Sequence, residues 1–207
     1  MSERALWLAV DDRGEPEIFH AIQGEGISQG APRVFIRLSG CNLHCVWCDT
    51  PYTWNWTESQ FAHEDGKKFD ISEERVKVGL TDVANKVSAF EPVGIVITGG
   101  EPLLQQRQLP AMIDAIKEQT GPIYVEIETN GSISPDAQFI ERVNQFNVSP
   151  KLHHSGNEPS LALNPDRLSF WRERPGANFK FVVSSPNDLD EIDALIRSHR
   201  IPASRVS

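Results

Sequence analysis

Residues 40–50 read GCNLHCVWCDT, and this stretch decides how the rest of the chain is interpreted. It holds the only cysteines of the chain, Cys41, Cys45 and Cys48, in the spacing C-x3-C-x2-C. Three thiolates on one short loop can hold a metal centre, whereas structural zinc sites and ordinary iron–sulfur clusters take four protein ligands. A four-iron cluster held by three cysteines leaves one iron open to another molecule. The spacing therefore indicates a reactive metal centre.

Two other uses of these cysteines have to be weighed. Disulfides are disfavoured because the number of cysteines is odd and their spacing is tight. A structural zinc site with three cysteines and either His44 or His20 remains an alternative. His44 lies between two of the cysteines, where ligation would strain the loop.

The length and net charge of the chain limit the classes of protein to which it can belong. A chain of 207 residues is long enough for one well-buried domain and short for two. Its 29 acidic and 20 basic residues give a net charge of -9, which argues against a nucleic-acid partner. The apolar stretches are far shorter than the roughly 20 residues that cross a bilayer, so no membrane segment is expected. Unpaired cysteines suit a reducing compartment, and we predict a cytoplasmic protein.

Short apolar runs alternate with longer amphipathic runs, which is typical of a parallel α/β fold. Strands are predicted over 33–38, 93–98, 123–128, 146–149 and 178–183, and helices over 81–90, 108–119, 135–145, 165–171 and 188–199. Ser134-Pro135 and Asn164-Pro165 are typical helix starts, with a capping residue before a proline, and Thr81 is a further candidate cap.

Two segments do not follow this alternation. Residues 52–78 are polar and without periodicity, and we predict a long loop with one turn at most. The last residues, 200–207, stand where the alternation requires another strand. We interpret residues 1–207 as a single domain that is truncated at its carboxyl end.

A second motif follows the cysteines. Residues 95–102, IVITGGEP, combine a buried strand with paired glycines that let the backbone approach a ligand closely. Together with the cysteine loop, this run resembles the radical S-adenosylmethionine (SAM) superfamily. The resemblance implies a partial (β/α)6 barrel, here lacking its last strand. It also implies a 4Fe-4S cluster on the three cysteines, with SAM chelating the fourth iron.

Further stretches narrow the resemblance. They are 18–26 (IFHAIQGEG), 34–38 (VFIRL), 47–50 (WCDT), 128–131 (ETNG) and 149–151 (SPK). In this order they resemble the 7-carboxy-7-deazaguanine synthase family of the 7-deazapurine (queuosine) pathway, over about residues 17–183. The resemblance implies conversion of 6-carboxy-5,6,7,8-tetrahydropterin to 7-carboxy-7-deazaguanine with loss of ammonia. The cofactors carry the radical chemistry, so no catalytic side chain is expected.

The resemblance also implies roles for individual residues. Substrate binding falls to Ile22, Gln23, Gly24, Arg37 and Thr98. SAM binding falls to Gly100, Glu101, Glu128, Ser149, Pro150 and Lys151. Thr50 corresponds to a ligand of Mg²⁺, although Asp49 is the more obvious ligand by charge. The implied partners are the pterin, an electron donor of flavodoxin or ferredoxin type and a second copy of the chain.

Arg37 is the most informative of these residues. It stands on a strand between apolar neighbours, where a guanidinium is costly unless it meets an anion. Its planar fork suits the carboxylate of the substrate, and the alternative is an internal salt bridge. The adjacent His153 and His154 invite a metal interpretation, but we expect them at the surface.

Two rival functions remain at this point. An activase that makes a glycyl radical on a partner protein would need the cysteines and the Gly-Gly-Glu-Pro run, but would have no use for Gln23 or Arg37. A non-catalytic module that binds zinc or a cluster would need only the cysteines. The colour of the anaerobically reconstituted protein separates a cluster from zinc.

Overall fold

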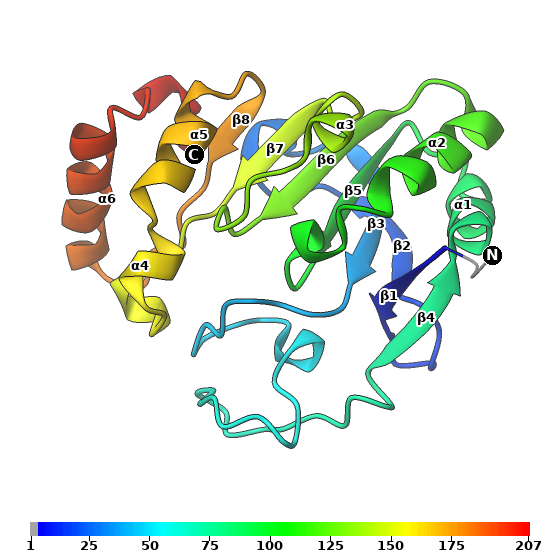
Figure 1. Cartoon of the computed structure of the whole chain (residues 1–207), viewed down its shortest axis with the longest axis horizontal. Helices are drawn as coiled ribbons and strands as arrows, with labels where there is room; N and C mark the ends of the chain where they lie inside the picture. Colours follow the sequence, from blue (N-terminus) through cyan, green and yellow to red (C-terminus); the bar gives the residue numbers. More distant parts are fainter. Residues whose placement is uncertain (1–3) are drawn as a thin grey trace.

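The computed structural model describes residues 4–207, and in this range strands and helices alternate (Figure 1). The strands are β1 (Ala5–Ala9), β2 (Ile18–Ile22), β3 (Pro32–Leu38), β4 (Arg75–Gly79), β5 (Gly94–Gly99), β6 (Tyr124–Thr129), β7 (Gln145–Val148) and β8 (Ala177–Phe179). The α-helices are α1 (Leu80–Ser88), α2 (Leu109–Thr120), α3 (Ala137–Ile140), α4 (Pro159–Ala162), α5 (Pro165–Glu173) and α6 (Pro186–His199). Short 3-10 helices are η1 (Gly26–Ser28), η2 (Pro51–Thr53), η3 (Pro102–Gln105), η4 (His153–Ser155) and η5 (Ala203–Arg205). None of the helices in residues 4–207 combines the length and the apolar character that a membrane span requires.

The strands form one sheet in the order β4-β1-β3-β5-β6-β7-β8, with β2 added to β3. From β3 to β8 the neighbours are parallel, which confirms the predicted parallel α/β sheet and its five strands. The path ends at β4 and β8, so the sheet is open, as in a partial barrel. Beyond β8, Val206 forms an isolated parallel bridge with Phe179.

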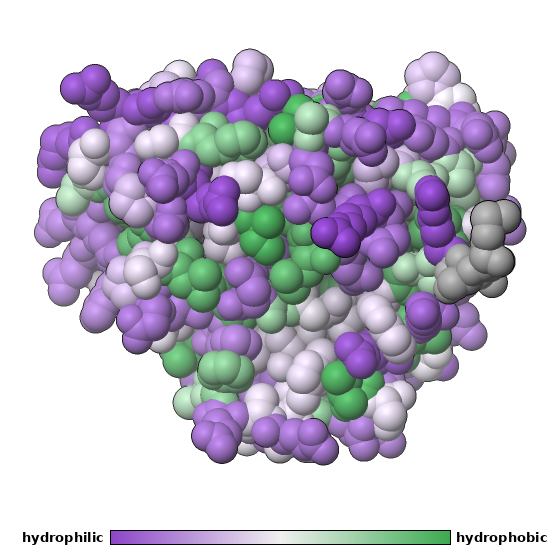
Figure 2. All heavy atoms as spheres, viewed as in Figure 1, coloured by the Kyte–Doolittle hydropathy of each residue, from purple (hydrophilic) through white to green (hydrophobic). Residues whose placement is uncertain are grey.

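The core lies between this sheet and the helices along its outer face. Helix α2 buries Leu109, Met112, Ile113 and Ile116, which share one helical face by their spacing. Each of these side chains contributes about 1.5–3 kcal/mol relative to an exposed position. In Figure 2 hydrophilic side chains dominate the outer rim of the molecule, and apolar ones appear between them in the middle of this face. The apolar helix faces hold the sheet in position and leave the strand ends free for function.

The prediction for residues 52–78 was wrong in its last part. Residues 75–79 form β4, which pairs with β1 in antiparallel register. Strand β4 lies at the edge of the sheet, and its two apolar residues, Val76 and Val78, alternate with charged ones, so its sequence offers no continuous apolar run. The ring of Trp7 lies beside these charges, with its centroid 4.2 Å from the Arg75 guanidinium carbon and 5.9 Å from Lys77 Nζ. The antiparallel strands β1 and β2 also had no counterpart in the prediction.

Several element ends differ from the prediction. Helix α3 covers only Ala137–Ile140 instead of 135–145, because Gln145 already begins β7 and the chain must turn before it. Helix α1 begins one residue before Thr81, with Gly79 at its N-cap, because β4 runs directly into the helix. Strand β8 ends at Phe179 rather than at Val183.

The capping prediction at Asn164 is confirmed. Its side-chain oxygen accepts hydrogen bonds from the backbone N–H groups of Asp166 and Arg167, at 3.0 and 3.2 Å. These bonds satisfy donors that have no partner inside the first turn of α5. Ser134 does not have this role, because the N-cap of α3 is Asp136.

Candidate functional site

A pocket of about 370 Å³ lies at the carboxyl ends of the parallel strands. The segment that carries the cysteines lies next to these strand ends, below them in Figure 1. The predicted site residues that line the pocket are Gln23, Gly24, Arg37, Cys41, Cys45, Cys48, Thr50, Thr98, Gly100, Glu128, Ser149 and Lys151. The fold therefore brings together residues that are up to 128 positions apart, from Gln23 to Lys151.

Three of the predicted site residues lie outside the lining. Ile22 is the last residue of β2, and 61% of its surface is exposed to solvent. Pro150 is buried between two lining residues. Glu101 is 1% exposed and faces the interior of the protein.

The carboxylate of Glu101 is fully used inside the protein. It accepts hydrogen bonds from the backbone N–H groups of Leu103 and Asn130, at 2.9 and 2.8 Å, and from the hydroxyl of Thr129, at 2.9 and 3.0 Å. Burial raises the pKa of this carboxyl, and the hydrogen bonds work against the rise. Glu101 thus ties β5 to the end of β6, and its carboxylate does not line the pocket.

The paired glycines allow two segments of backbone to approach each other. Gly99 has φ of +127°, and a Cβ there would lie 2.0 Å from the carbonyl oxygen of Leu38. A Cβ at Gly100 would lie 2.2 Å from the carbonyl oxygen of Gly40. The N–H groups of Gly100 and Glu101 donate to these same carbonyls, at 3.1 and 2.8 Å. The close approach that we predicted toward a ligand is thus also an approach to the start of the cysteine loop.

The three cysteines are free thiols at the same end of the sheet. Burial raises the pKa of Cys41 to about 12, and it also raises the pKa of Cys45. A metal ligand must be a thiolate, and a bound cation supplies the charge that favours this form. The three cysteine thiols therefore suit a bound group that carries several positive charges, because such a group stabilises their thiolate forms.

The histidines of the zinc alternative lie elsewhere. The His44 ring stacks on Phe61 with centroids 3.4 Å apart and meets the edge of Trp54. The His20 ring stacks against Phe90, next to α1. Within residues 4–207, no three His, Cys, Asp or Glu side chains converge as ligands of a single ion.

Arg37 lines the pocket and also has a partner inside the protein. Its Nε donates to Glu17 at 2.6 Å, and the Tyr52 hydroxyl donates to the other oxygen of Glu17 at 2.9 Å. Burial disfavours the charged guanidinium, but Glu17, Tyr52 and Asp49 together outweigh this effect and raise the pKa of Arg37. The internal salt bridge that was the alternative for Arg37 is present. Nε is the only atom of the guanidinium with a hydrogen bond among the described residues.

Three predicted residues form one hydrogen-bonded group. The Glu128 carboxylate accepts from Gln23 Nε2 at 3.1 Å and from the Thr98 hydroxyl at 2.8 Å. Glu128 was assigned to SAM, and Gln23 and Thr98 to the substrate. Their contact places the two predicted binding regions side by side.

The prediction missed two charged residues of the lining. Lys180 follows β8 and forms an ion pair with Glu25, which belongs to the loop after β2. The position of Lys180 after a parallel strand is a signal that could have identified it, because ligands of parallel sheets gather there. Phe19, Phe35, Trp47 and Trp54 also line the pocket, and the sequence analysis assigned no role to them.

Thr50 and Asp49 both line the pocket next to Cys48. The Thr50 hydroxyl lies 3.6 Å from the Cys48 sulfur, and Thr50 is the residue before η2. A hydroxyl oxygen and a carboxylate are both ligands of the kind that Mg²⁺ accepts.

Lys151 is the cation nearest to the cysteines in the lining. Its Nζ donates to the Ser149 hydroxyl at 2.9 Å and lies 5.7 Å from the centroid of the Trp47 ring. Burial lowers the pKa of Lys151, and the neighbouring thiols oppose this effect.

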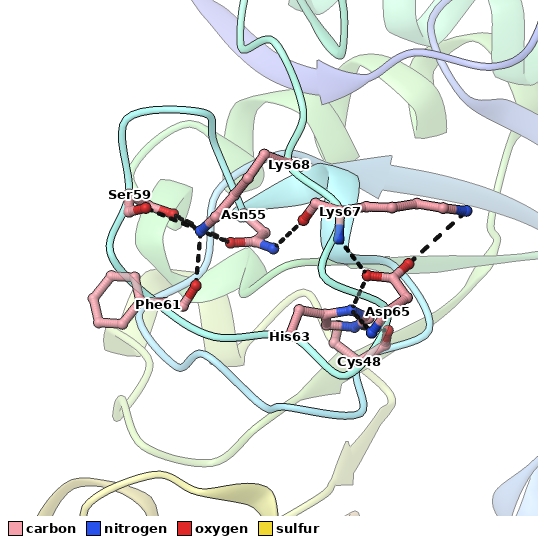
Figure 3. A network of polar contacts seen from close by, with 8 residues as sticks. All are labelled: Cys48, Asn55, Ser59, Phe61, His63, Asp65, Lys67 and Lys68. Carbon is pink, nitrogen blue, oxygen red and sulfur yellow. Dashed lines mark hydrogen bonds and ion pairs between the residues drawn. The ribbon is translucent and has the colours of Figure 1, made fainter.

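Residues 55–68 form a flap that is held by its own polar contacts (Figure 3). Lys68 Nζ lies within 2.7–2.9 Å of four oxygens, which belong to Asn55, Ser59 and Phe61. The His63 ring joins the flap to the cysteine loop, because Nε2 lies 2.8 Å from the Cys48 carbonyl oxygen. Its Nδ1 lies 2.6 Å from an Asp65 oxygen.

One of the adjacent histidines is not at the surface as expected. His153 is exposed, but the His154 ring stacks on Trp47 with centroids 5.3 Å apart. Its Nδ1 lies 3.3 Å from an oxygen of Asp188, in the first turn of α6. Trp47 lies between two cysteines, so this contact fixes α6 against the cysteine loop.

Three kinds of comparison with known proteins find similar families, relatives and structures. Residues 22–164 match a family model described as a 4Fe-4S single cluster domain. A 7-carboxy-7-deazaguanine synthase of Pyrobaculum aerophilum is 35% identical over 191 residues, covering 92% of this chain and 75% of the relative. The enzyme of the same name from Hyperthermus butylicus is 33% identical over 190 residues, covering 92% and 73%. The crystal structure of QueE from Escherichia coli superposes with a TM-score of 0.55 at 21% identity, over 97% of this chain and 92% of that chain, which supports the fold.

Proposed function

The chain belongs to the 7-carboxy-7-deazaguanine synthase family, and we propose that it converts 6-carboxy-5,6,7,8-tetrahydropterin to 7-carboxy-7-deazaguanine with loss of ammonia. This is the radical SAM step of 7-deazapurine (queuosine) biosynthesis. The observation that carries the proposal is the placement of three cysteine thiols and Arg37 in the lining of one pocket. A radical cofactor and a carboxylate substrate can therefore meet in the same space.

Cys41, Cys45 and Cys48 are the proposed ligands of a 4Fe-4S cluster. The donor set fits this group, because it offers three thiols and no fourth cysteine in the chain. When bound, the cluster and SAM supply the radical that takes a hydrogen from the substrate, and the protein supplies position and electrostatics. The charge of Lys151 in the lining supports the thiolate forms.

Gly100, Glu128, Ser149 and Lys151 are the proposed SAM contacts. Each lies at or just after the end of a parallel strand, where ligands of parallel sheets bind. The Glu128 carboxylate already accepts from Gln23 and Thr98. Each carboxylate oxygen has a second lone pair, so Glu128 can also accept from the ribose hydroxyls of SAM.

Arg37 is the proposed partner of the substrate carboxylate. Because Glu17 takes the Nε of the guanidinium, the two terminal nitrogens are left for a second anion. The salt bridge thereby orients the guanidinium so that its free edge can bind a carboxylate in two-point geometry. Gln23 and Thr98 would hold the pterin edge, and Gly24 leaves the adjacent backbone open.

The remaining parts of the proposal concern the surroundings of the site. Thr50 is the proposed protein ligand of Mg²⁺, with water and substrate oxygens completing the octahedron. We also propose a flavodoxin- or ferredoxin-type electron donor, a homodimer and a cytoplasmic location, where thiols stay reduced.

The test is product analysis of the anaerobically reconstituted protein. Reduced enzyme with SAM, Mg²⁺ and carboxytetrahydropterin should give the mass of 7-carboxy-7-deazaguanine, together with release of ammonia. Tetrahydropterin without the carboxyl group is the matched control and should react poorly. A colourless protein loaded with zinc would contradict the proposal, and so would a brown protein that cleaves SAM but leaves the pterin unchanged.

A further inference from the structure

Residues 152–157, which follow β7, lie directly against the cysteine loop. The Val46 N–H donates to the Ser155 carbonyl at 3.0 Å, and the His44 N–H donates to Asn157 Oδ1 at 2.8 Å. Gly156 adopts φ of +77°, and a Cβ there would lie 2.9 Å from a methyl carbon of Val46. The two segments therefore fit together with no room for a side chain at this glycine.

Within this contact, the amide of Asn157 points at a proposed cluster ligand. Its Nδ2 donates to the Cys45 sulfur at 3.2 Å and to the Ser155 hydroxyl at 3.1 Å, which uses both of its hydrogens. The orientation of the amide is determined by its other end, because the His44 N–H needs an acceptor and only Oδ1 can serve. The N–H group must therefore face the sulfur.

The other two cysteines have more distant side-chain donors. Asn130 Nδ2 lies 3.9 Å from the Cys41 sulfur, and the Thr50 hydroxyl lies 3.6 Å from the Cys48 sulfur. Cys45 also has the smallest exposed surface of the three, 7%. A hydrogen bond to a thiolate is strongest where water does not compete, so the donor of Asn157 acts at a sulfur that is largely shielded from water.

We propose that Asn157 is a positioning residue that donates a hydrogen bond to the Cys45 thiolate and thereby raises the reduction potential of the cluster. Reduction adds one electron, and so one negative charge, to the cluster and its ligands. An N–H dipole aimed at a ligand sulfur stabilises that added charge, and hydrogen bonds to the sulfurs are among the factors that determine such potentials. The inference rests on the proposed cluster but not on the identity of the substrate.

The test compares two asparagines at different distances from the same group. The midpoint potential of the reconstituted cluster is measured by dithionite titration followed by electron paramagnetic resonance, without SAM or pterin. Asn157→Ala should lower the reduction equilibrium constant about tenfold, which is about 59 mV for a one-electron couple. Asn130→Ala removes the same side chain at the longer distance and should give a clearly smaller shift.

A second variant distinguishes the hydrogen bond that Asn157 donates to the Cys45 sulfur from the one that it accepts from the His44 N–H. Asn157→Asp keeps an acceptor for the His44 N–H but places a carboxylate at the sulfur, so the potential should fall below that of Asn157→Ala. An unchanged potential in either loaded variant would overturn the inference, as would an equal shift in Asn130→Ala.

The inference can also be tested without assembling the cluster in any variant. Transfer of the wild-type holoenzyme into D2O should shift its iron–sulfur stretching bands in resonance Raman spectra, because the Asn157 hydrogen exchanges. Bands that do not move would overturn the inference even if both variants failed to assemble the cluster. A wild-type protein that holds no cluster at all would overturn the proposed function together with the inference, which distinguishes the two failures.

Discussion

On one side of the pocket the cysteine loop is held largely through its backbone, whereas on the other side the charged side chains hold one another. Residues 61–65 of the flap contact the loop through the Cys48 and Val46 carbonyls, and residues 152–157 contact it through the His44 and Val46 N–H groups. Among the charged side chains of the proposed substrate side and the rest of the lining, Arg37 pairs with Glu17 and Lys180 pairs with Glu25.

The difference agrees with what we propose that each side binds. A cluster stays in place through many reactions, so its ligands need a loop whose backbone keeps one conformation. A substrate comes and goes, and a buried charge without a partner would be costly between visits. Internal partners such as Glu17 remove this cost and keep the side chain oriented. We therefore expect changes on the cysteine side to abolish binding and changes on the substrate side to weaken it.

The largest effect is expected from the cysteines. Replacing any one of Cys41, Cys45 or Cys48 by alanine should abolish cluster binding and SAM cleavage, because the remaining two thiols cannot hold a four-iron group that needs three. Iron content, the visible absorbance and the yield of 5′-deoxyadenosine measure the effect. A single cysteine variant that forms 5′-deoxyadenosine at the wild-type rate would contradict this prediction, because changes on the cysteine side would then not abolish binding.

The second effect concerns the approach of β5 to the end of β3, just before the cysteine loop. Gly99→Ala places a methyl group 2.0 Å from the Leu38 carbonyl oxygen at φ of +127°, and should lower the free energy of unfolding by on the order of 4 kcal/mol or more. Gly30→Ala is the matched control, because its φ of +89° is also unfavourable for alanine but nothing lies within 4 Å.

The Gly30 variant should lose only the cost of the backbone conformation, roughly 1–2 kcal/mol. Urea unfolding of the two variants measures the difference. Equal losses would mean that the close approach at Gly99 does not matter for stability.

The third effect tests the substrate side. If the free edge of Arg37 binds the substrate carboxylate in a partly dry site, Arg37→Ala should weaken substrate binding by about 2–5 kcal/mol. Arg37→Lys should rescue poorly, because an ammonium cannot bind Glu17 and a second carboxylate through one planar group. SAM binding and cluster content should barely change in either variant.

The preference of the enzyme between two pterins tests the predicted role of Arg37. Wild-type enzyme should prefer carboxytetrahydropterin over tetrahydropterin far more strongly than Arg37→Ala does, as measured by kcat/KM for both compounds. The same preference in both proteins would assign Arg37 to the salt bridge with Glu17 alone.

The smallest effect is expected at Asp188, which supports the cysteine loop from outside through His154. Hydrogen bonds, first of all from the Ser184 N–H, lower the pKa of Asp188 from 3.8 to about 2. Because the folded-state pKa lies below the unfolded one, the carboxylate stabilises the fold above about pH 3.8, and this stability is lost as the pH falls toward 2. Melting temperatures of Asp188→Asn and wild type should therefore converge on acidification.

Asp190→Asn is the control for this measurement, because it removes a carboxylate from the exposed side of the same helix. Its melting temperature should stay parallel to that of the wild type between about pH 4 and 2. Convergence in the control as well would assign the effect to the net charge of the protein.

Local patterns were sufficient for much of the fold and for the identity of the cysteine loop. The five parallel strands and the cap at Asn164 follow from side-chain periodicity and capping preference, which act within a few residues. Strand β4 was not recognised in this way, because its short alternation of Val76 and Val78 with charged residues follows a long polar segment, and its partner is the distant strand β1. Whether such a segment forms a strand depends on a neighbour that the local sequence does not contain.

By itself the sequence identified the residues to which we assign the proposed chemistry, namely the three cysteines, the paired glycines and Arg37. Only the tertiary structure decided what these residues contact. It assigned Glu101 to the interior, gave Arg37 its partner Glu17, and placed Asn157 at the sulfur of Cys45, 112 positions away. The physical reason is that hydrogen bonds and ion pairs act over a few ångströms in space, and the distance between two residues in space is set by the order of the strands.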